Sequence, residues 1–421
     1  MTGGPAPARV IGLMSGTSCD AIDAAAAELS FDGDTLVLTP LGMVSDRYSD
    51  ELREALAAAL PPAATTLAEV CRLDTLIGRA FAGVAVRADA ELCGGRAGLV
   101  VSHGQTVYHW AEDGRVHGTL QLGRSAWIAE ATGCPVISDL RARDVAAGGQ
   151  GAPLVSVVDT LWLRGRPGVP AALNLGGIAN LTVVPPDRDP VAFDTGPANA
   201  LLDAAVRHLT GGRQEFDEDG ALAARGRVDP ALLHRLLDEP YYARPAPKTT
   251  GRELFHLPYL RAALAGRGPL APEDVLATLT RLTARTVADA VRAVGATEVV
   301  ASGGGTRNPV LLDTVRDALD GVPLCTSDDL GLPSAAKEAY AFAVLGQLTV
   351  HGLAGTVPSC TGARRAAVLG SVTPGRRPLT LPAPRAAAPV RLRITGAPGD
   401  GGSAAEGPAS DGPASDGPGA G

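Results

Sequence analysis

Two patterns of hydrophobic and polar positions recur along the chain, and each predicts one kind of secondary structure. Short apolar runs before turns of glycine and small polar residues predict strands, as at residues 10–14 and 169–173. Apolar residues three and four positions apart predict amphipathic helices, as at residues 67–92 and 276–294. Because strands precede helices in each half of the chain, we expect an α/β protein.

A polar turn follows the first predicted strand and precedes a second one. Gly16 permits close backbone approach in this turn. Thr17 and Ser18 carry hydroxyl groups, and Asp20 carries a carboxylate. Unpaired backbone N–H groups in such a turn bind anions, and a carboxylate beside an anion implies a divalent cation between them. We interpret the stretch as a phosphate loop for a nucleoside triphosphate, with an ordinary hairpin turn as the alternative.

A second hairpin of the same type occurs at residues 169–184, with its turn at residues 174–180. Two halves that each open with such a hairpin indicate a duplicated fold with a cleft between the halves. Polar clusters also follow predicted strands elsewhere, which is the placement that a shared cleft requires. These clusters lie at residues 102–105, 138–144, 194 and 302–308.

Each polar cluster also has a purely structural interpretation, which the residues alone leave open. These alternatives are a helix cap at Asp194, solvated ion pairs of Asp139 and Asp144 with Arg141 and Arg143, a structural histidine at His103, an exposed helix residue at Glu338, and a plain turn at residues 303–305.

Composition and charge narrow the classes of function. The chain has 421 residues, of which 45% are hydrophobic, enough for two or more domains. No apolar run is long enough to span a bilayer, and residues 1–9 lack the pattern of a secretory signal, so we expect no membrane partner. Six scattered cysteines without C-x-x-C favour reduced thiols in a cytoplasmic protein. The net charge of −8, without a basic cluster, argues against nucleic acid as a partner.

The end of the chain has a different composition. From residue 382 onward it consists mainly of Ala, Gly, Pro, Ser and Asp, and the sequence G-P-A-S-D at residues 407–411 repeats at once. Such a segment cannot bury enough apolar surface to fold, so we predict a disordered tail at residues 382–421.

Several segments together, in order along residues 10–370, resemble one family. The two hairpin turns, Asp194 and the glycine turn resemble motifs of the actin/hexokinase/Hsp70 ATPase superfamily. More narrowly, the chain resembles the anhydro-N-acetylmuramic acid kinase family. The matching segments are G-L-M-S-G-T-S-C-D at 12–20, S-H-G-Q-T at 102–106, G-G-Q-G-A-P-L at 148–154, N-L-G-G-I-A-N at 174–180, F-D-T-G-P at 193–197, F-D-E-D-G at 216–220, P-K-T-T-G-R-E at 247–253, G-G-G at 303–305 and E-A-Y-A-F-A at 338–343.

The resemblance implies a fold and a reaction. The fold is α/β, with two actin-like (RNase H-like) domains at residues 8–155 and 156–375 and a nucleotide cleft between them. The reaction opens the 1,6-anhydro bridge of anhydro-N-acetylmuramic acid with water and phosphorylates O6 from ATP. Its product, N-acetylmuramic acid 6-phosphate, belongs to peptidoglycan recycling. The resemblance also implies a homodimer and Mg²⁺ as cofactor.

The resemblance further implies roles for individual residues. Asp194 matches the catalytic aspartate, and a carboxylate suits a base that activates water. Asp20 matches the carboxylate that holds Mg²⁺. The implied nucleotide contacts are Gly16, Thr17, Ser18, Cys19, Asp20, Ala21, Ile22, Asp23, Asn174, Gly176, Gly177, Gly303, Gly304, Gly305 and Asn308. The implied contacts of the amino sugar are His103, Gln105, Arg143, Asp144 and Glu338, and Arg143 suits the substrate's carboxylate.

The sequence departs from the family pattern at two glycine positions, which are Ala21 and Ala198 here. A Cβ at Ala21 would cost roughly 1 kcal/mol if this residue had a left-handed conformation. Two alternatives to the implied function remain, namely a kinase of another amino sugar with the same fold and a non-catalytic nucleotide-binding protein. The presence of Asp20 and Asp194 argues against the second alternative.

Overall fold

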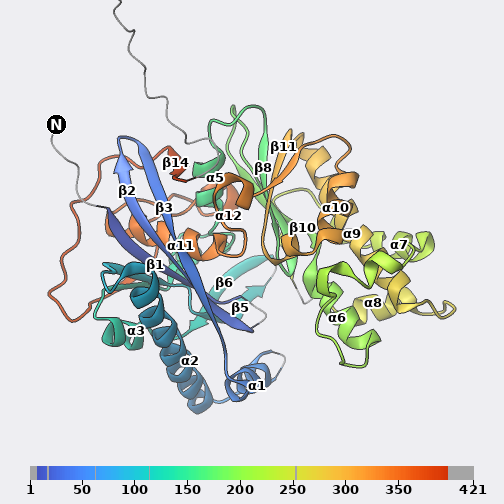
Figure 1. The fold of residues 1–421 in the computed structure, drawn as a ribbon, viewed down its shortest axis with the longest axis horizontal. Helices are drawn as coiled ribbons and strands as arrows, with labels where there is room; N and C mark the ends of the chain where they lie inside the picture. The colour runs from blue at the N-terminus through green and yellow to red at the C-terminus, as the bar shows by residue number, and fades with distance from the viewer. Residues whose placement is uncertain (1–6, 17–18, 62, 113, 252–253, 397–421) are drawn as a thin grey trace, which may run out of the picture.

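The computed structural model describes residues 7–16, 19–61, 63–112, 114–251 and 254–396. Thr17 and Ser18, two of the predicted nucleotide contacts, therefore lie outside the described residues. The described chain forms two large mixed sheets, with helices on their faces (Figure 1).

The first sheet has seven strands in the order β13-β7-β4-β1-β2-β3-β14. Their bounds are β1 Ala8–Met14, β2 Ala21–Asp32, β3 Thr35–Arg47, β4 Leu99–Ser102, β7 Val136–Ser138, β13 Ser371–Thr373 and β14 Arg391–Ile394. The second sheet has five strands in the order β10-β9-β8-β11-β12. Their bounds are β8 Pro170–Leu175, β9 Ile178–Val183, β10 Val191–Pro197, β11 Glu298–Ser302 and β12 Leu324–Thr326. A separate hairpin pairs β5 Gln105–Glu112 with β6 Arg115–Leu122.

The two sheets share one topology. In each, the first three strands pair antiparallel, and the fourth and fifth strands lie parallel to the first. The five-strand units therefore have the same order, third-second-first-fourth-fifth, namely β3-β2-β1-β4-β7 and β10-β9-β8-β11-β12. This repetition confirms the predicted duplication and the α/β fold class.

Helices cover both faces of the sheets. They are α1 Asp50–Ala59, α2 Leu67–Ala88, α3 Ser125–Thr132, α4 Leu140–Ala146, α5 Ser156–Leu163, α6 Asn199–Leu209, α7 Pro230–Leu237, α8 Leu257–Leu264, α9 Pro272–Val294, α10 Pro309–Ala318, α11 Lys337–Val350 and α12 Pro358–Thr361. Shorter helical turns are Asp89–Cys93, Glu218–Gly220, Ala223–Arg225, Pro240–Ala243, Gly304–Arg307 and Asp328–Leu330. Every described helix is too short or too polar to cross a bilayer.

The core follows the two-residue period of the strands. On β2, Ala25 and Ala27 are buried in the cluster that contains α11, whereas Ala24 and Ala26 are buried with α2 on the opposite face. The helix α11 lies close to β1, because a Cβ on Gly12 would overlap the carbonyl oxygen of Ala339. The start of α11 is thereby fixed beside the end of β1.

Three late elements return to the first sheet. Figure 1 shows the orange helix α11 against the blue strands, and β13 and β14 pair with β7 and β3. The sequence assigned α11 and β13 to the second domain, so the division at residues 155 and 375 does not follow the sheets. The prediction that the tail is disordered from residue 382 is wrong for β14, where Leu392 and Ile394 are buried. The remaining tail, residues 397–421, lies outside the described residues.

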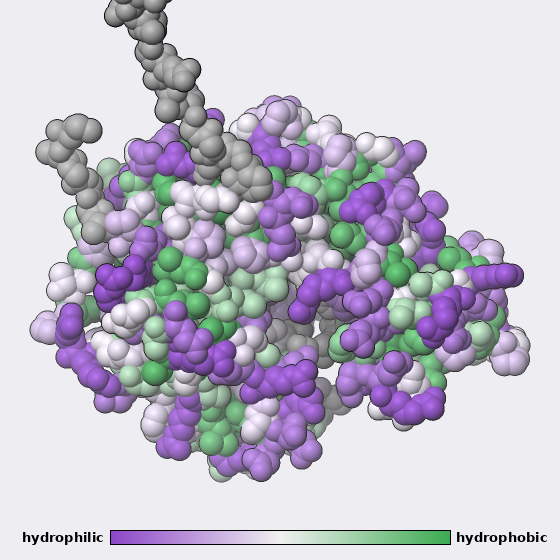
Figure 2. Space-filling view, viewed as in Figure 1, coloured by the Kyte–Doolittle hydropathy of each residue, from purple (hydrophilic) through white to green (hydrophobic). Residues whose placement is uncertain are grey.

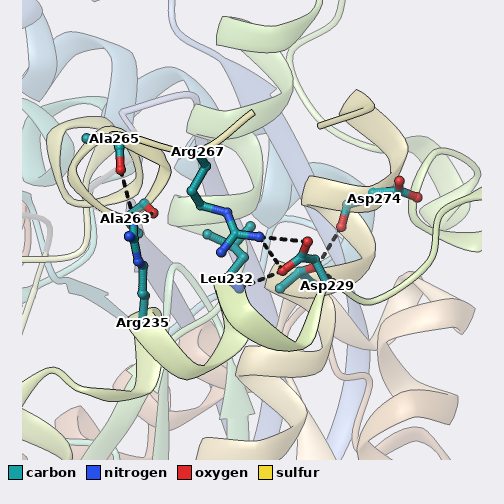
Figure 3. A network of polar contacts seen from close by, with 8 residues as sticks. Asp229, Leu232, Arg235, Ala263, Ala265, Arg267 and Asp274 are labelled. Carbon is teal, nitrogen blue, oxygen red and sulfur yellow. Dashed lines mark hydrogen bonds and ion pairs between the residues drawn. The ribbon is translucent and has the colours of Figure 1, made fainter. Parts of the chain in front are cut away.

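A group of helices on the second half is held by a polar network (Figure 3). The Asp229 side chain accepts a hydrogen bond from the Leu232 N–H and so caps α7. Arg267 donates to both carboxylate oxygens of Asp229. Arg235 donates to the carbonyl groups of Ala263 and Ala265 at the end of α8. On the face shown in Figure 2, hydrophilic and hydrophobic residues are interspersed over both halves.

Candidate functional site

A cavity of about 590 Å³ lies between the two halves. Its wall combines the first hairpin, residues 152–156, the second hairpin, residues 302–307 and the start of α11. The predicted site residues that line it are Gly16, Asp20, Ala21, Asp23, Asn174, Gly176, Asp194, Gly303, Gly304 and Glu338. The structure therefore brings together most of the predicted nucleotide segments and the predicted catalytic carboxylate.

The first hairpin makes a tight turn before β2. Cys19 has a left-handed backbone with φ of 57°, and its N–H donates to the Gly16 carbonyl at 3.2 Å. The side chains of Cys19 and Ile22 are buried in the core, and neither residue lines the cavity. Ala21 begins β2 in an extended conformation. The backbone strain considered at Ala21 is thus absent, because the left-handed position is Cys19.

The second hairpin is held by the start of α6. The side-chain amide of Asn199 donates to the carbonyls of Leu175 and Gly176, at 3.0 and 2.9 Å. The Gly177 carbonyl accepts from the N–H groups of Ala198 and Ala200. Ala198 has φ of −131°, so its methyl group causes no left-handed strain. These bonds fix the backbone of the turn that faces the cavity.

The glycine turn after β11 lies against the second hairpin. Gly303 has φ of 90°, and a Cβ there would overlap the side-chain oxygen of Asn174. A Cβ on Gly305 would lie 2.7 Å from the Leu175 Cβ. Both positions therefore require glycine for close approach. Asn308 lies outside the cavity wall and caps α10, since its Oδ1 accepts from the Leu311 N–H at 3.0 Å.

Asp194 lies on β10 at an irregularity in its pairing with β9. Its Oδ2 accepts a hydrogen bond from the Thr250 N–H at 2.8 Å. Its backbone N–H donates to the Lys248 carbonyl, and its carbonyl accepts from the Tyr241 hydroxyl. The N-cap of α6 is Ala198, so Asp194 is not the helix cap that the sequence left open. The segment at residues 241–250 instead fixes this carboxylate at the cavity.

Two further carboxyl groups of the cavity wall have shifted pKa values. Burial raises the pKa of Glu338, although the charges of Arg141 and Lys337 oppose the shift. Burial also raises the pKa of Asp23, against a hydrogen bond with Ser45. Glu338 Oε1 accepts from the Asn174 side-chain amide at 3.3 Å, which links α11 to the second hairpin. The alternative of an exposed helix residue at Glu338 is therefore wrong.

Four predicted sugar contacts do not line this cavity. The Gln105 side chain is fully buried and bonds Ser15, Tyr48 and the Gly16 carbonyl, so it supports the first hairpin. His103 is buried behind Arg141. Asp144 is fully buried, and Arg143 is exposed. The structure therefore gives no support for direct sugar contact by these four side chains.

Four charged residues of the cavity wall are outside the predicted set of site residues, namely Arg141, Asp159, Arg307 and Lys337. The Lys337 ammonium and Asp159 form a buried ion pair at 2.6 Å. Arg141 belongs to the same polar cluster as Arg143. Two residues apart on a helix, the two side chains point in nearly opposite directions. The sequence shows the cluster, but the phase of α4 decides which arginine faces the cavity.

Comparison with known proteins identifies the family. A family model described as anhydro-N-acetylmuramic acid kinase matches residues 8–375. The chain belongs to the anhydro-N-acetylmuramic acid kinase family. As a member of this family it is a phosphotransferase.

Relatives named anhydro-N-acetylmuramic acid kinase match nearly the full chain. One from Streptomyces avermitilis is 74% identical over 91% of this chain and 99% of its own length. One from Streptomyces coelicolor is 67% identical over 93% of this chain and 100% of its own length. One from Rhodococcus erythropolis is 63% identical over 92% of this chain and 99% of its own length. Among solved structures, a ROK family glucokinase from Streptomyces griseus shares 14% identity, covers 80% of this chain and 97% of its own, and has a TM-score of 0.33.

Proposed function

We propose that this chain uses ATP and Mg²⁺ to open the 1,6-anhydro bridge of anhydro-N-acetylmuramic acid with water and to phosphorylate O6. The product is N-acetylmuramic acid 6-phosphate, an intermediate of peptidoglycan recycling in the cytoplasm. The observation that carries the proposal is that Asp194 and both glycine-rich turns line one cavity, in a chain of this kinase family.

The proposed base is Asp194. The Thr250 N–H orients its carboxylate, and the carboxylate lies in the cavity wall. In that position it accepts a proton from a water molecule that attacks the anomeric carbon. The bond from the anomeric carbon to O6 then breaks, and O6 attacks the γ-phosphorus of ATP, whose bond to the β,γ-bridging oxygen breaks so that ADP leaves. Positioning and electrostatics supply most of the rate of such a transfer.

The proposed phosphate contacts are the backbones of the two hairpins, and the glycine turn at residues 303–305 is the proposed contact of the adenosine. Gly16 and Gly176 line the cavity without side chains, so phosphate oxygens can approach backbone N–H groups there. Asp20 is exposed in the same wall. No group of three His, Cys, Asp or Glu side chains among the described residues forms a metal site. The Asp20 carboxylate in the cavity wall fits Mg²⁺, which proteins commonly hold through one or two carboxylates, phosphate oxygens and water. When bound, Mg²⁺ neutralises phosphate charge.

The experiment is a mass-spectrometric product assay with Mg-ATP and anhydro-N-acetylmuramic acid. The wild type is expected to form the 6-phosphate. Asp194→Asn is expected to lower kcat by roughly 10³-fold, because the amide cannot accept the proton. Its affinity for ADP in calorimetry should stay close to that of the wild type.

Asp187→Asn is the matched control, since Asp187 is exposed on the second half of the chain. This variant should keep full turnover. A wild type that binds ATP but leaves the sugar unchanged would refute the proposed function, and a panel of other amino sugars would then test the alternative of a different substrate.

A further inference from the structure

We propose that Arg141 binds the carboxylate of the sugar acid and thereby selects this substrate against neutral anhydro sugars. The inference rests on the proposed function, and it names the residue that recognises the acidic group. It replaces the expectation that Arg143 has this role, because Arg143 is exposed and outside the cavity wall.

Two neutral acceptors fix the Arg141 side chain. Its Nε donates to His103 Nε2 at 2.8 Å, and its Nη1 donates to the Gly151 carbonyl at 2.7 Å. Arg141 also lines the cavity together with Glu338. The guanidinium group is therefore oriented before a ligand arrives, which lowers the entropy cost of binding.

The guanidinium charge has no ion pair within the part of the chain that the structure describes. Burial lowers its pKa, although Glu338 and Asp144 act in the opposite direction. The group still stays protonated at neutral pH, because arginine has a very high intrinsic pKa. A part-buried charge without an ion-pair partner is costly, and an anionic ligand in the cavity would remove this cost. The planar guanidinium group suits a carboxylate.

The hydrogen bonds of Arg141 hold it in the first half of the chain. Both of its acceptors, His103 and Gly151, belong to the first half of the chain. The first hairpin, a proposed phosphate contact, also belongs to this half, and Gly16 lines the same cavity as Arg141. The KM for ATP in the test below therefore distinguishes a carboxylate of the sugar from a phosphate of the nucleotide.

Asp144 positions Arg141 indirectly. One of its carboxylate oxygens accepts from the Gly151 N–H at 2.8 Å, and the other accepts from the Thr361 hydroxyl at 2.8 Å. Asp144 thus ties the loop that carries the Gly151 carbonyl to α12. His103 is the second positioning residue. Burial and the charge of Arg141 hold its pKa well below the ordinary value, so its ring remains a neutral acceptor for Arg141.

The test compares anhydro-N-acetylmuramic acid with anhydro-N-acetylglucosamine, which lacks the lactyl carboxylate. In the wild type, kcat/KM should be greater for the acid. Arg141→Met should raise KM for the acid between about 10- and 100-fold, because the hydrogen bonds to the charged carboxylate are lost. It should leave kcat/KM for the neutral sugar and KM for ATP within a factor of about three. Arg141→Lys should restore part of the preference for the acid. Arg143→Met is the matched control, and it should leave kcat/KM unchanged for both sugars.

A second variant tests the positioning role. Asp144→Asn should raise KM for the acid with KM for ATP unchanged, whereas a merely structural residue would weaken both sugars equally. If the wild type does not turn over the neutral sugar, dissociation constants from calorimetry with ADP present give the same comparison.

Three results would overturn the inference. An increase of KM for ATP in Arg141→Met, with the sugar preference kept, would assign Arg141 to a phosphate. An equal loss for both sugars in Arg141→Met and Arg141→Lys would assign it a structural role. An unchanged preference in both variants would exclude Arg141 from recognition. In contrast, a wild type that binds the acid preferentially but forms no 6-phosphate would contradict the proposed function and leave Arg141 as the acid-binding residue.

Discussion

The ionised form of Glu338 lowers the stability of the folded protein, because the side chain is buried beside the cavity. Because burial raises its pKa, the folded state binds more protons than the unfolded state between the ordinary value of 4.5 and the raised value. Stability from this group is therefore greatest below pH 4.5 and is lost as the pH rises through the raised value.

The corresponding prediction concerns Glu338→Gln. The variant should melt at a higher temperature than the wild type at pH 7.5, and the difference should disappear as the pH approaches 4.5. Calorimetric melting curves across this range are the measurement. A variant that is less stable than the wild type at pH 7.5 would show that the charges of Arg141 and Lys337 outweigh the burial of the carboxylate.

At the residue scale, the sequence predicted those site residues whose position depends on the short segment around them. Asp194 and Gly303 were predicted from the short apolar runs that precede them, and the structure places Asp194 on β10 and Gly303 directly after β11. Arg143 was assigned from the resemblance to the family, whereas the structure has Arg141 in the cavity wall, and a sequence does not fix the phase of a short helix such as α4. Asp144 was assigned to the sugar, although its partner Thr361 is 217 residues away and is found only in the structure.

At the scale of elements, β14 closes the edge of the first sheet. It pairs with β3 in parallel, from Arg391 beside Thr35 to Ile394 beside Leu38. The Val390 N–H also donates to the Asp34 carbonyl at 2.8 Å. The composition of the surrounding segment concealed this strand, because a four-residue alternation of arginine and aliphatic residues barely changes the average over forty positions.

Two truncations test the importance of β14. A chain that ends at residue 396 keeps the strand and should unfold in urea like the full-length protein. A chain that ends at residue 382 loses the burial of Leu392 and Ile394, and it should be less stable by roughly 3–6 kcal/mol. Equal unfolding midpoints for the two truncations would show that β14 contributes little to the first sheet.

At the scale of the whole molecule, Lys337 joins elements that lie far apart in the sequence. Its ammonium group pairs with Asp159 of α5 at 2.6 Å, and it donates to the Ser302 hydroxyl at the end of β11. The side chains of Lys337 and Asp159 are only 4% and 7% exposed. The start of α11 is therefore tied both to α5 and to the end of β11, directly before the glycine turn.

Breaking this pair should destabilise the molecule strongly. Lys337→Met leaves the Asp159 charge buried without its partner, and we expect a loss of roughly 3–5 kcal/mol in the free energy of unfolding. The double variant with Asp159→Leu should recover most of that loss. Arg316→Met breaks an exposed pair with Asp313 and serves as the control, with an expected change below about 1 kcal/mol. A double variant as unstable as Lys337→Met would contradict this explanation.

The duplicated arrangement was predictable, because two similar hairpins begin the two halves. The return of α11 to the first sheet was not, because its burial on nearly all sides leaves a continuous apolar pattern that does not indicate which sheet it contacts. That return places Glu338 opposite Asn174 and completes the cavity.

The central claim is that one cavity couples the opening of the anhydro ring to phosphoryl transfer. The most direct measurement is mass spectrometry of anhydro-N-acetylmuramic acid after incubation with the wild type and either Mg-ATP or Mg-ADP. With Mg-ATP, each product molecule should gain one water and one phosphoryl group, with no accumulation of unphosphorylated N-acetylmuramic acid, and with Mg-ADP the anhydro sugar should remain intact. Ring opening in the presence of Mg-ADP, or ATP hydrolysis that leaves the anhydro sugar unchanged, would contradict the account.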